Sequence, residues 1–250
     1  MPKFFVKNDQ IDNGKVTING EDVNHISNVL RMKKNDLINI CNIETQENYI
    51  ANITNISKTE VICNILEKIK SNAESNVEVD IFQGLPKSDK MELIIQKSVE
   101  LGVKKIIPVE MKRCVVKLDN KDKIKKVERW NKIAEVAAKQ SGRNIIPIID
   151  NIKNINEISN KFDEYDLVLL CYENEKEVFL KTVLKQYKNY THIKIAVIVG
   201  PEGGIDISEV MHMQQYGAKV ISLGSRILRT ETVSLAMLSV IMYEFERNES

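Results

Sequence analysis

The stretch VEVDIFQGLPKSDKMELIIQKSVELGVKKIIPVEM, residues 77–111, decides how this chain folds. Its mainly apolar ends, residues 77–85 and 103–111, predict two strands. Between them, apolar residues recur at helical spacing over residues 91–99, and Gly102 is the expected C-terminal stop of a helix. Two strands joined by a helix form a βαβ unit, so this stretch predicts a parallel sheet.

The same alternation of strands and helices continues to the end of the chain. Further helices are predicted at residues 120–142, 175–187 and 206–217, and a last one begins near Thr230. Further strands are predicted at residues 145–149, 166–173, 193–200 and 218–224. Several of these strands are uniformly apolar, which is typical of a parallel sheet covered on both faces. We therefore predict an α/β domain over residues 73–250.

The first part of the chain has a different character. Alternating apolar and polar residues predict short strands at residues 15–18, 36–41, 48–56 and 60–69, with one helix between the first two. The polar stretch KSNAESN, residues 70–76, lacks periodicity and is expected to be a linker. We predict a small β-barrel domain over residues 1–72.

Composition and charge exclude several classes of protein. The chain is 43% apolar and 28% charged, which is ordinary for a folded, water-soluble protein. With 36 basic and 35 acidic residues, the overall charge neither demands nor excludes a nucleic-acid partner. The four cysteines are far apart and the three histidines are isolated, so we expect no disulfide frame and no metal site. The N-terminal segment MPKFFVKNDQ lacks an apolar run of signal-peptide length, and no apolar stretch is long enough for a membrane span, so a cytoplasmic location is expected.

Three loops follow predicted strands, at the sheet edge where ligands of such domains bind. They cover residues 169–174, 199–206 and 223–232. The second contains GPEGG, residues 200–204, whose glycines permit positive φ and let a ligand lie against the backbone, although a plain tight turn explains the same residues. Neither a G-x-G-x-x-G nor a G-x-x-x-x-G-K-[ST] pattern occurs, which argues against a dinucleotide fold or a P-loop.

The third loop, LGSRILRTET, raises an electrostatic question. Thr230 or Thr232 is the expected N-cap of the last helix. Arg226 and Arg229 then face the positive end of the helix dipole, which is unfavourable. This unfavourable interaction of the two arginines with the helix dipole suggests an anionic or electron-rich partner.

Six segments in order along the chain carry a resemblance to a known family. They are HISNVLRMKKND (25–36), KSDKMELIIQKSVELGVKKIIPV (87–109), RCVVK (113–117), AAKQSGR (137–143), VGPEGGI (199–205) and LGSRILRTETVSLA (223–236). Together they resemble the SPOUT methyltransferases, and specifically the RsmE family, which methylates uridine N3 in 16S ribosomal RNA. Where that family usually has KGDR(M/F)E, this chain reads KSDKME, with Ser88 for glycine and Lys90 for arginine.

The resemblance implies a fold, a cofactor and partners. It implies a PUA-like RNA-binding β-barrel followed by a SPOUT-type α/β domain, with a mainly parallel sheet and a last stretch threaded as a trefoil knot. It implies S-adenosylmethionine as methyl donor, 16S rRNA or the small ribosomal subunit as partner, and a homodimer, with no metal and no membrane. The apolar last helix is compatible with this, because a helix that is apolar nearly all round must be buried.

The resemblance also implies site residues. The cofactor is expected to contact Leu170, Cys171, Gly200, Pro201, Glu202, Gly203, Gly204, Leu223, Gly224, Ile227, Leu228 and Thr230. Arg229 is expected near the target base, where it would stabilise the uracil anion, with Arg226 as a phosphate or base contact and Glu202 as a candidate base or orienting group. The expected RNA contacts are Arg31, Lys33, Lys34, Lys87, Lys90, Arg113 and Arg143.

Other functions remain open at this stage. A SPOUT enzyme could modify another rRNA or tRNA nucleotide, since the loops do not identify the base. A catalytically silent RNA-binding or assembly factor could keep the same fold. A phosphate-binding dehydrogenase or hydrolase is disfavoured, because its glycine and nucleophile motifs are missing.

Overall fold

The computed structural model describes residues 1–71 and 73–246. Asn72, where the predicted first domain ends, and residues 247–250 of the predicted second domain lie outside the described residues. The chain forms two compact units. Unit 1 contains residues 1–74 and 138–146, and unit 2 contains residues 75–137 and 147–250. The sequence did not predict that residues 138–146 group with unit 1.

Unit 1 is built on one six-stranded sheet with the order β1-β4-β5-β6-β3-β2. β1 pairs with β4 in parallel, and the other neighbours pair antiparallel. Its elements are β1 (Lys3–Val6), a 3-10 turn (Asn8–Gln10), β2 (Ile11–Asp12), β3 (Lys15–Asn19), α1 (Glu21–Asn24), a π-helical turn (His25–Val29), β4 (Leu37–Asn42), β5 (Asn48–Ile56) and β6 (Glu60–Ile69). The four predicted strands are confirmed, because every second residue points into one apolar core. The short strands β1 and β2 were missed.

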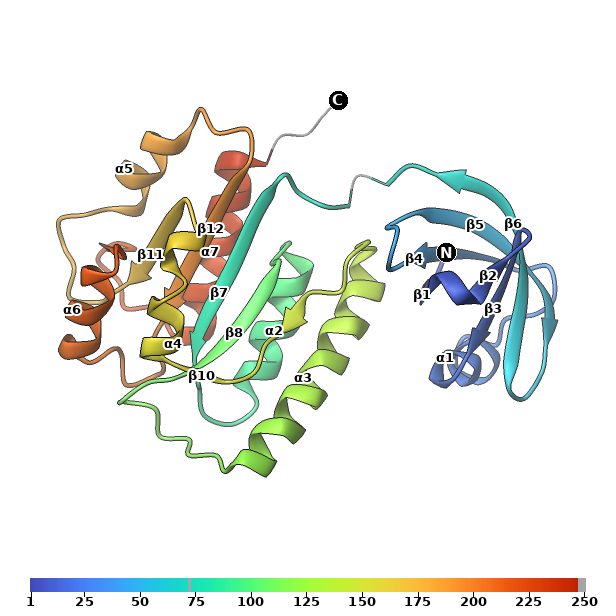
Figure 1. Ribbon diagram of the computed structural model, residues 1–250, viewed down its shortest axis with the longest axis horizontal. Coiled ribbons are helices and arrows are strands. Elements are labelled where there is room, and N and C mark those ends of the chain that lie inside the picture. Colours follow the sequence, from blue (N-terminus) through green and yellow to red (C-terminus); the bar gives the residue numbers. More distant parts are fainter. Residues whose placement is uncertain (72, 247–250) are drawn as a thin grey trace. The chain divides into compact units, whose positions relative to one another are not determined.

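Unit 2 contains a parallel sheet with the order β10-β8-β7-β12-β11-β13, and β9 also pairs with β8 (Figure 1). All its pairings among the described residues are parallel. Its strands are β7 (Val77–Gly84), β8 (Lys105–Glu110), β9 (Ile148–Ile149), β10 (Lys153–Asn154), β11 (Leu167–Cys171), β12 (Ile193–Val199) and β13 (Lys219–Ile221). The predicted parallel sheet is confirmed.

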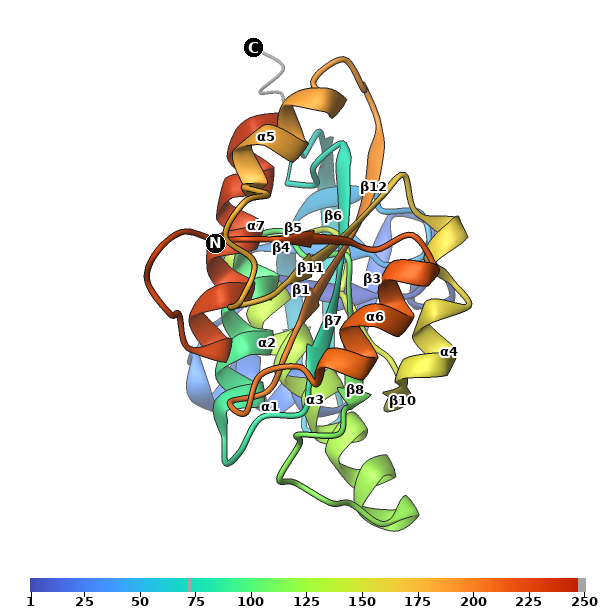
Figure 2. The ribbon, with the colours of Figure 1, turned by 90° about the vertical axis from the view of Figure 1, so that its left-hand side faces the viewer.

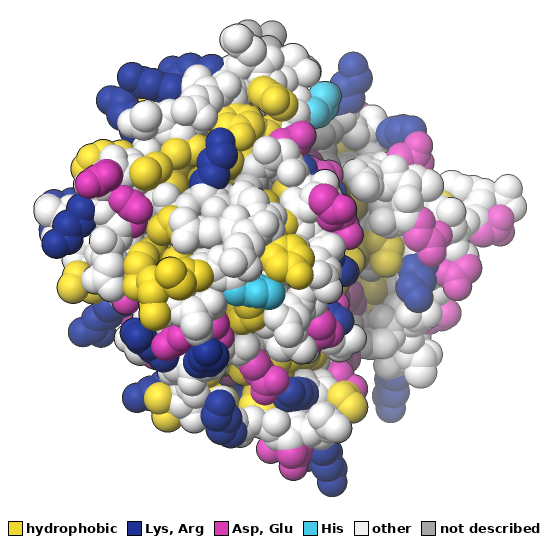
Figure 3. All heavy atoms as spheres, turned by 60° about the vertical axis from the view of Figure 1, so that its left-hand side comes forward, with side chains coloured by type: hydrophobic (Ala, Val, Ile, Leu, Met, Phe, Trp, Pro, Cys, Tyr) yellow, Lys and Arg dark blue, Asp and Glu magenta, His cyan; other side chains and the backbone are white. Residues whose placement is uncertain are grey.

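Helices cover both faces of this sheet. Figure 2 shows α2 and α7 on one face and α4 and α6 on the other. The helices are α2 (Lys90–Glu100), α3 (Asn120–Ser141), α4 (Ile155–Ser159), α5 (Leu180–Leu184), α6 (Ile207–Gln215) and α7 (Thr230–Phe245), with 3-10 turns at Phe162–Glu164 and Lys185–Tyr187. On the side that carries α5 and α6, charged side chains of both signs lie among hydrophobic ones (Figure 3). None of the described helices combines the length and the apolar character that a membrane crossing requires.

The helix predicted over residues 175–187 is wrong in its first part. The Glu175 carboxylate accepts hydrogen bonds from the backbone N–H groups of Glu177 and Val178, at 2.7 and 3.1 Å, which stabilises a turn. Phe179 then forms an isolated β-bridge with Ser222. Local side-chain bonds of this kind compete with helix formation, so α5 begins only at Leu180.

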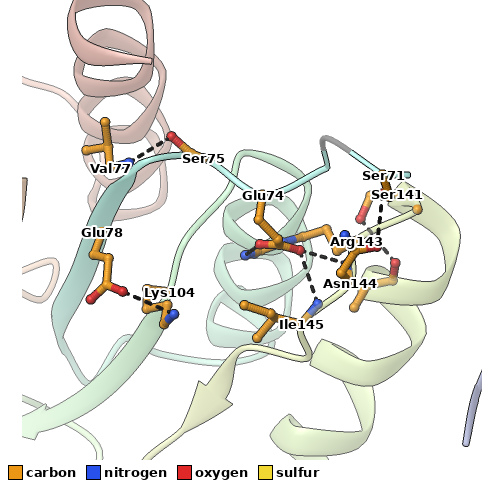
Figure 4. Close-up of polar contacts among 12 residues, drawn as sticks. Ser71, Glu74, Ser75, Val77, Glu78, Lys104, Ser141, Arg143, Asn144 and Ile145 are labelled. Atoms are coloured by element: carbon orange, nitrogen blue, oxygen red, sulfur yellow. Dashed lines mark hydrogen bonds and ion pairs between the residues drawn. The ribbon is translucent and has the colours of Figure 1, made fainter. Parts of the chain in front are cut away.

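Within unit 1, Glu74 ties the segment after α3 to the end of the β-rich region (Figure 4). Its carboxylate pairs with the Arg143 guanidinium at 2.6 Å and accepts hydrogen bonds from the backbone N–H groups of Asn144 and Ile145, at 2.7 and 3.1 Å. Arg143 is only 4% exposed. The guanidinium predicted to contact RNA is therefore buried in an ion pair, and we exclude it from the RNA footprint.

We expect Glu74→Gln to destabilise the protein by about 3 kcal/mol, because it removes the carboxylate that pairs with the buried Arg143 guanidinium. Glu100→Gln is the matched control, since Glu100 pairs with Lys97 at the surface of α2 and should cost less than about 0.5 kcal/mol. Urea denaturation of both variants measures the difference. Equal midpoints for the two variants would show that the Glu74 ion pair contributes little.

Candidate functional site

The loops that follow β11, β12 and β13 meet at the carboxyl ends of these parallel strands and enclose a cavity of about 490 Å³. This volume lies in the range of small-molecule and cofactor sites. The cavity is lined by Lys90, Cys171, Tyr172, Glu173, Val199, Gly200, Pro201, Glu202, Gly203, Gly204, Ser222, Leu223, Gly224, Ser225, Arg226, Ile227, Leu228, Arg229, Thr230 and Val233. The three predicted loops, far apart in sequence, therefore share one site.

Glycines let the backbone pack closely around the GPEGG turn. A Cβ on Gly84, the last residue of β7, would lie 2.7 Å from the backbone nitrogen of Pro201. A Cβ on Gly200 would lie 2.7 Å from Cγ1 of Ile205. Gly204 has φ of +71°, a conformation that other residues rarely adopt. These glycines are needed for the shape of the turn.

The first turn of α7 is tied to the ends of β7 and β12 by a buried chain of hydrogen bonds. The Thr230 hydroxyl donates to the Gly200 carbonyl at 2.6 Å and accepts from the Gln83 amide at 2.9 Å. The Ser234 hydroxyl donates to Oε1 of Gln83 at 2.6 Å. The prediction that Thr230 or Thr232 caps the helix is wrong, because the N-cap is Arg229 and no side chain caps it. The Thr230 hydroxyl instead fixes one wall of the cavity.

Lys90 lies between two carboxylates at the edge of the cavity. Its ammonium is 3.1 Å from Oε1 of Glu202 and 3.3 Å from Oε2 of Glu231. The backbone N–H of Lys87 also donates to Glu202, at 3.1 Å. Burial opposes ionisation of Glu202, but backbone hydrogen bonds and the bond from Lys90 outweigh it and lower the pKa of this carboxyl. A carboxylate with a lowered pKa is a weaker proton acceptor, which favours the orienting role for Glu202 over the role of base.

Ser88 adopts φ of +54°, in the left-handed region. This explains why a glycine suits the position in the family that the sequence resembles. We expect Ser88→Gly to stabilise the protein by up to about 1 kcal/mol, because the left-handed conformation costs other residues about 1–2 kcal/mol and the freer unfolded chain offsets part of this. The melting temperature should rise by about 2–4 °C.

The control for this variant is Ser239→Gly. Ser239 is an exposed residue inside α7, where glycine should destabilise by about 0.5 kcal/mol. A melting temperature lowered equally by both substitutions would contradict the strain at Ser88.

The two arginines of the third loop are exposed and line the cavity. Among the described residues, no hydrogen bond or ion pair joins the guanidinium of Arg226 or Arg229 to another side chain or backbone group. Their charges are therefore available to a ligand. The anionic or electron-rich partner expected for them stays a prediction.

Arg113 packs against the GPEGG turn. Its guanidinium donates to the Gly203 carbonyl at 3.2 Å and lies 3.7 Å from the Asp206 carboxylate, which caps α6. Lys87 is exposed beside the same turn. In unit 1, Arg31, Lys33 and Lys34 are all exposed. These cations remain predicted RNA contacts because they are exposed, whereas Lys90 is partly buried between Glu202 and Glu231.

Of the predicted cofactor residues, Leu170 is the exception. It is fully buried inside β11 and does not line the cavity. Burial raises the pKa of the Cys171 thiol to about 12, so this side chain is a protonated part of the wall. The sequence missed Tyr172 and Glu173 as lining residues, although both lie in the first predicted loop. Across residues 1–71 and 73–246, no group of three or more His, Cys, Asp or Glu residues is placed to hold a metal ion.

Two family models match this chain. Residues 73–242 match the model of an RNA methyltransferase domain, and residues 18–66 match that of an RNA methyltransferase PUA domain. The chain is 37% identical to ribosomal RNA small subunit methyltransferase E of Bacillus subtilis, over 98% of each chain. The chain belongs to the ribosomal RNA small subunit methyltransferase E family. The predicted family, RsmE, is confirmed.

Solved structures resemble the whole chain. An RsmE protein from Neisseria gonorrhoeae bound to S-adenosyl methionine has a TM-score of 0.86 and 29% identity, over 98% of both chains. A putative methyltransferase from Legionella pneumophila in complex with S-adenosyl methionine has a TM-score of 0.86 and 27% identity, also over 98% of both chains.

Proposed function

We propose that this RsmE-family chain transfers a methyl group from S-adenosylmethionine to N3 of one uridine in 16S rRNA of the small ribosomal subunit. The observation that supports this most strongly is the cavity, in which the GPEGG turn, the loop after β11 and the segment before α7 meet. The site lies at the strand ends where α/β sheets bind ligands. We propose that the reaction takes place in the cytoplasm.

The residues present fit this cofactor. The glycine-rich turn exposes backbone N–H and C=O groups, and the apolar residues Val199, Leu223 and Leu228 supply surfaces for an adenine ring. We propose that the backbone of Gly200, Gly204 and Gly224 holds the polar edges of the molecule. When bound, S-adenosylmethionine supplies an electrophilic methyl group on a sulfonium sulfur.

The protein must make uridine N3 nucleophilic. N3 carries a proton, and its loss to solvent water places negative charge on O2 and O4 of the base. We propose that the Arg229 guanidinium donates hydrogen bonds to one of these oxygens and stabilises the anion. Arg226 would contact a phosphate or the base, and Glu202, held by Lys90, would orient the turn.

We propose that the RNA is held by cations on both units: Arg31, Lys33 and Lys34 in unit 1, and Lys87 and Arg113 in unit 2. Contacts of this kind release counter-ions from the RNA, so binding should weaken steeply as salt concentration rises. The exposure of all five residues supports this footprint.

We also propose that the chain is a homodimer that uses one face of α7. Ala236, Val240 and Tyr243 follow one another at helical spacing, and Val240 and Tyr243 are 43% and 89% exposed. The opposite face of α7 is buried, so an exposed apolar face on this helix is suited to a second copy. Light scattering should find a dimer for the natural chain and a monomer for Val240→Glu. A monomeric natural chain would contradict the proposal.

The SPOUT-type trefoil knot belongs to the same proposal. Its support is that residues 200–204 and 223–229 line one cavity and that Thr230 is hydrogen-bonded to Gly200. Tracing the chain through residues 190–246 in an experimental structure tests it. An unthreaded path would refute the knot without affecting the proposed reaction.

The activity is tested by calorimetry and by methyl transfer. We expect micromolar binding of S-adenosylmethionine and incorporation of its labelled methyl group into 16S rRNA of small subunits that lack this modification. Binding without any transfer to rRNA would favour a catalytically silent RNA-binding factor. Transfer to tRNA alone would show a different substrate.

A further inference from the structure

One carboxylate in the cavity wall has no partner in the part of the chain that the structure describes. Glu173 follows β11 and lines the cavity. Among the described residues, no hydrogen bond or ion pair joins its carboxylate to another group. It lies close to Gly204, because a Cβ added to that glycine would overlap Oε1 of Glu173. The carboxylate therefore lies directly against the backbone of the GPEGG turn.

Each of the other charged residues that line the cavity has a partner or a proposed role. The Glu202 carboxylate is neutralised by Lys90 and by the N–H of Lys87. Arg226 and Arg229 lie on the segment before α7, where we have assigned them to RNA. Among the described residues of the lining, Glu173 is the carboxylate whose charge is not matched by an adjacent cation.

The proposed reaction changes the charge of the cofactor. S-adenosylmethionine carries a sulfonium, and S-adenosylhomocysteine, the product, carries a neutral thioether at the same atom. The two molecules otherwise differ by one methyl group, which by itself gives an apolar pocket only modest discrimination. An unmatched carboxylate in a partly enclosed cavity attracts the cationic form more strongly than the neutral one.

We propose that Glu173 makes this pocket prefer the cationic methyl donor over the neutral product. The inference rests on the proposed function and adds a specificity-determining residue to it. The preference depends on the charge of the ligand and not on its shape. A new S-adenosylmethionine molecule therefore replaces S-adenosylhomocysteine more readily after each transfer. The carboxylate is exposed at the cavity wall, so added salt should reduce the preference.

The test is calorimetry on the full chain with three ligands: S-adenosylmethionine, S-adenosylhomocysteine and sinefungin, which carries an amine in place of the methylsulfonium. Glu173→Gln removes the charge and keeps the size of the side chain. We expect the ratio of the Kd of the product to the Kd of the donor to fall about tenfold, equivalent to about 1.4 kcal/mol. Sinefungin, protonated at neutral pH, should lose affinity as the donor does.

Glu128→Gln is the matched control, because Glu128 is an exposed carboxylate on α3 that does not line the cavity. Its Kd ratio should equal that of the natural chain. If Glu173→Gln leaves the ratio unchanged, or weakens both ligands equally, the inference is overturned while the proposed function stands. A natural chain that binds none of the three ligands would overturn both.

Discussion

Arg229→Ala should lower the rate of methyl transfer at least about a hundredfold while leaving the Kd of S-adenosylmethionine within about threefold. The reason is that the Arg229 guanidinium is exposed at the cavity and has no partner among the described residues, so it is available to the developing uracil anion. Loss of one positioned donor at an oxyanion typically costs a factor of about 10²–10³ in rate. Single-turnover transfer to small subunits, with cofactor binding measured in parallel, separates the two effects.

Arg129→Ala is the matched control for this experiment. Arg129 is an exposed arginine on α3 whose partner is Glu92, and such surface pairs contribute little to stability. Its turnover should be close to that of the natural chain. If Arg229→Ala retained turnover within a few fold of Arg129→Ala, the base-contacting role of Arg229 would be wrong.

Gly84→Ala should weaken binding of S-adenosylmethionine by at least about tenfold. The added Cβ would meet the backbone nitrogen of Pro201 at 2.7 Å, and a backbone atom cannot move aside as a flexible side chain can. The GPEGG turn would have to shift away from β7, which opens the cavity. Calorimetry measures the loss of affinity, and the melting temperature shows whether the variant remains folded.

The control is Gly217→Ala. Gly217 has φ of +97°, so alanine is strained there, but no heavy atom lies within 4 Å of the new Cβ. This variant should lose stability and keep its cofactor affinity within about twofold. Equal losses of affinity in the two variants would mean that general destabilisation, and not the shape of the turn, governs binding.

Local patterns in the sequence were sufficient for most of the fold. β5 and β6 begin and end at the residues predicted from their alternation, and α7 begins at Thr230 as expected. The alternation of apolar and polar residues in the strands and the helical spacing of apolar residues in α7 both depend only on residues close in the chain. The helix over residues 175–187 failed because the Glu175 carboxylate and a β-bridge at Phe179 stabilise a different local structure.

The sequence predicted the loops that form the site but not the contacts between side chains that are distant in sequence. The glycines of GPEGG and the arginines of the third loop indicate a ligand, and the structure brings them to one cavity. The burial of Arg143 depends on Glu74, far away in the sequence. Likewise, the ion pairs of Lys90 with Glu202 and Glu231 join three separate segments. Such pairings arise from tertiary structure, so neither spacing nor composition reveals them.

Nucleoside analysis by mass spectrometry tests the central claim most directly. Small subunits that lack the modification are incubated with the purified chain and S-adenosylmethionine, and their 16S rRNA is then digested to nucleosides. We predict one 3-methyluridine per 16S rRNA, and only a small fraction of that when Arg229→Ala replaces the natural chain in an assay stopped once the natural chain has completed the reaction. A methyl group on another base, or on a different atom of uridine, would contradict the proposed reaction.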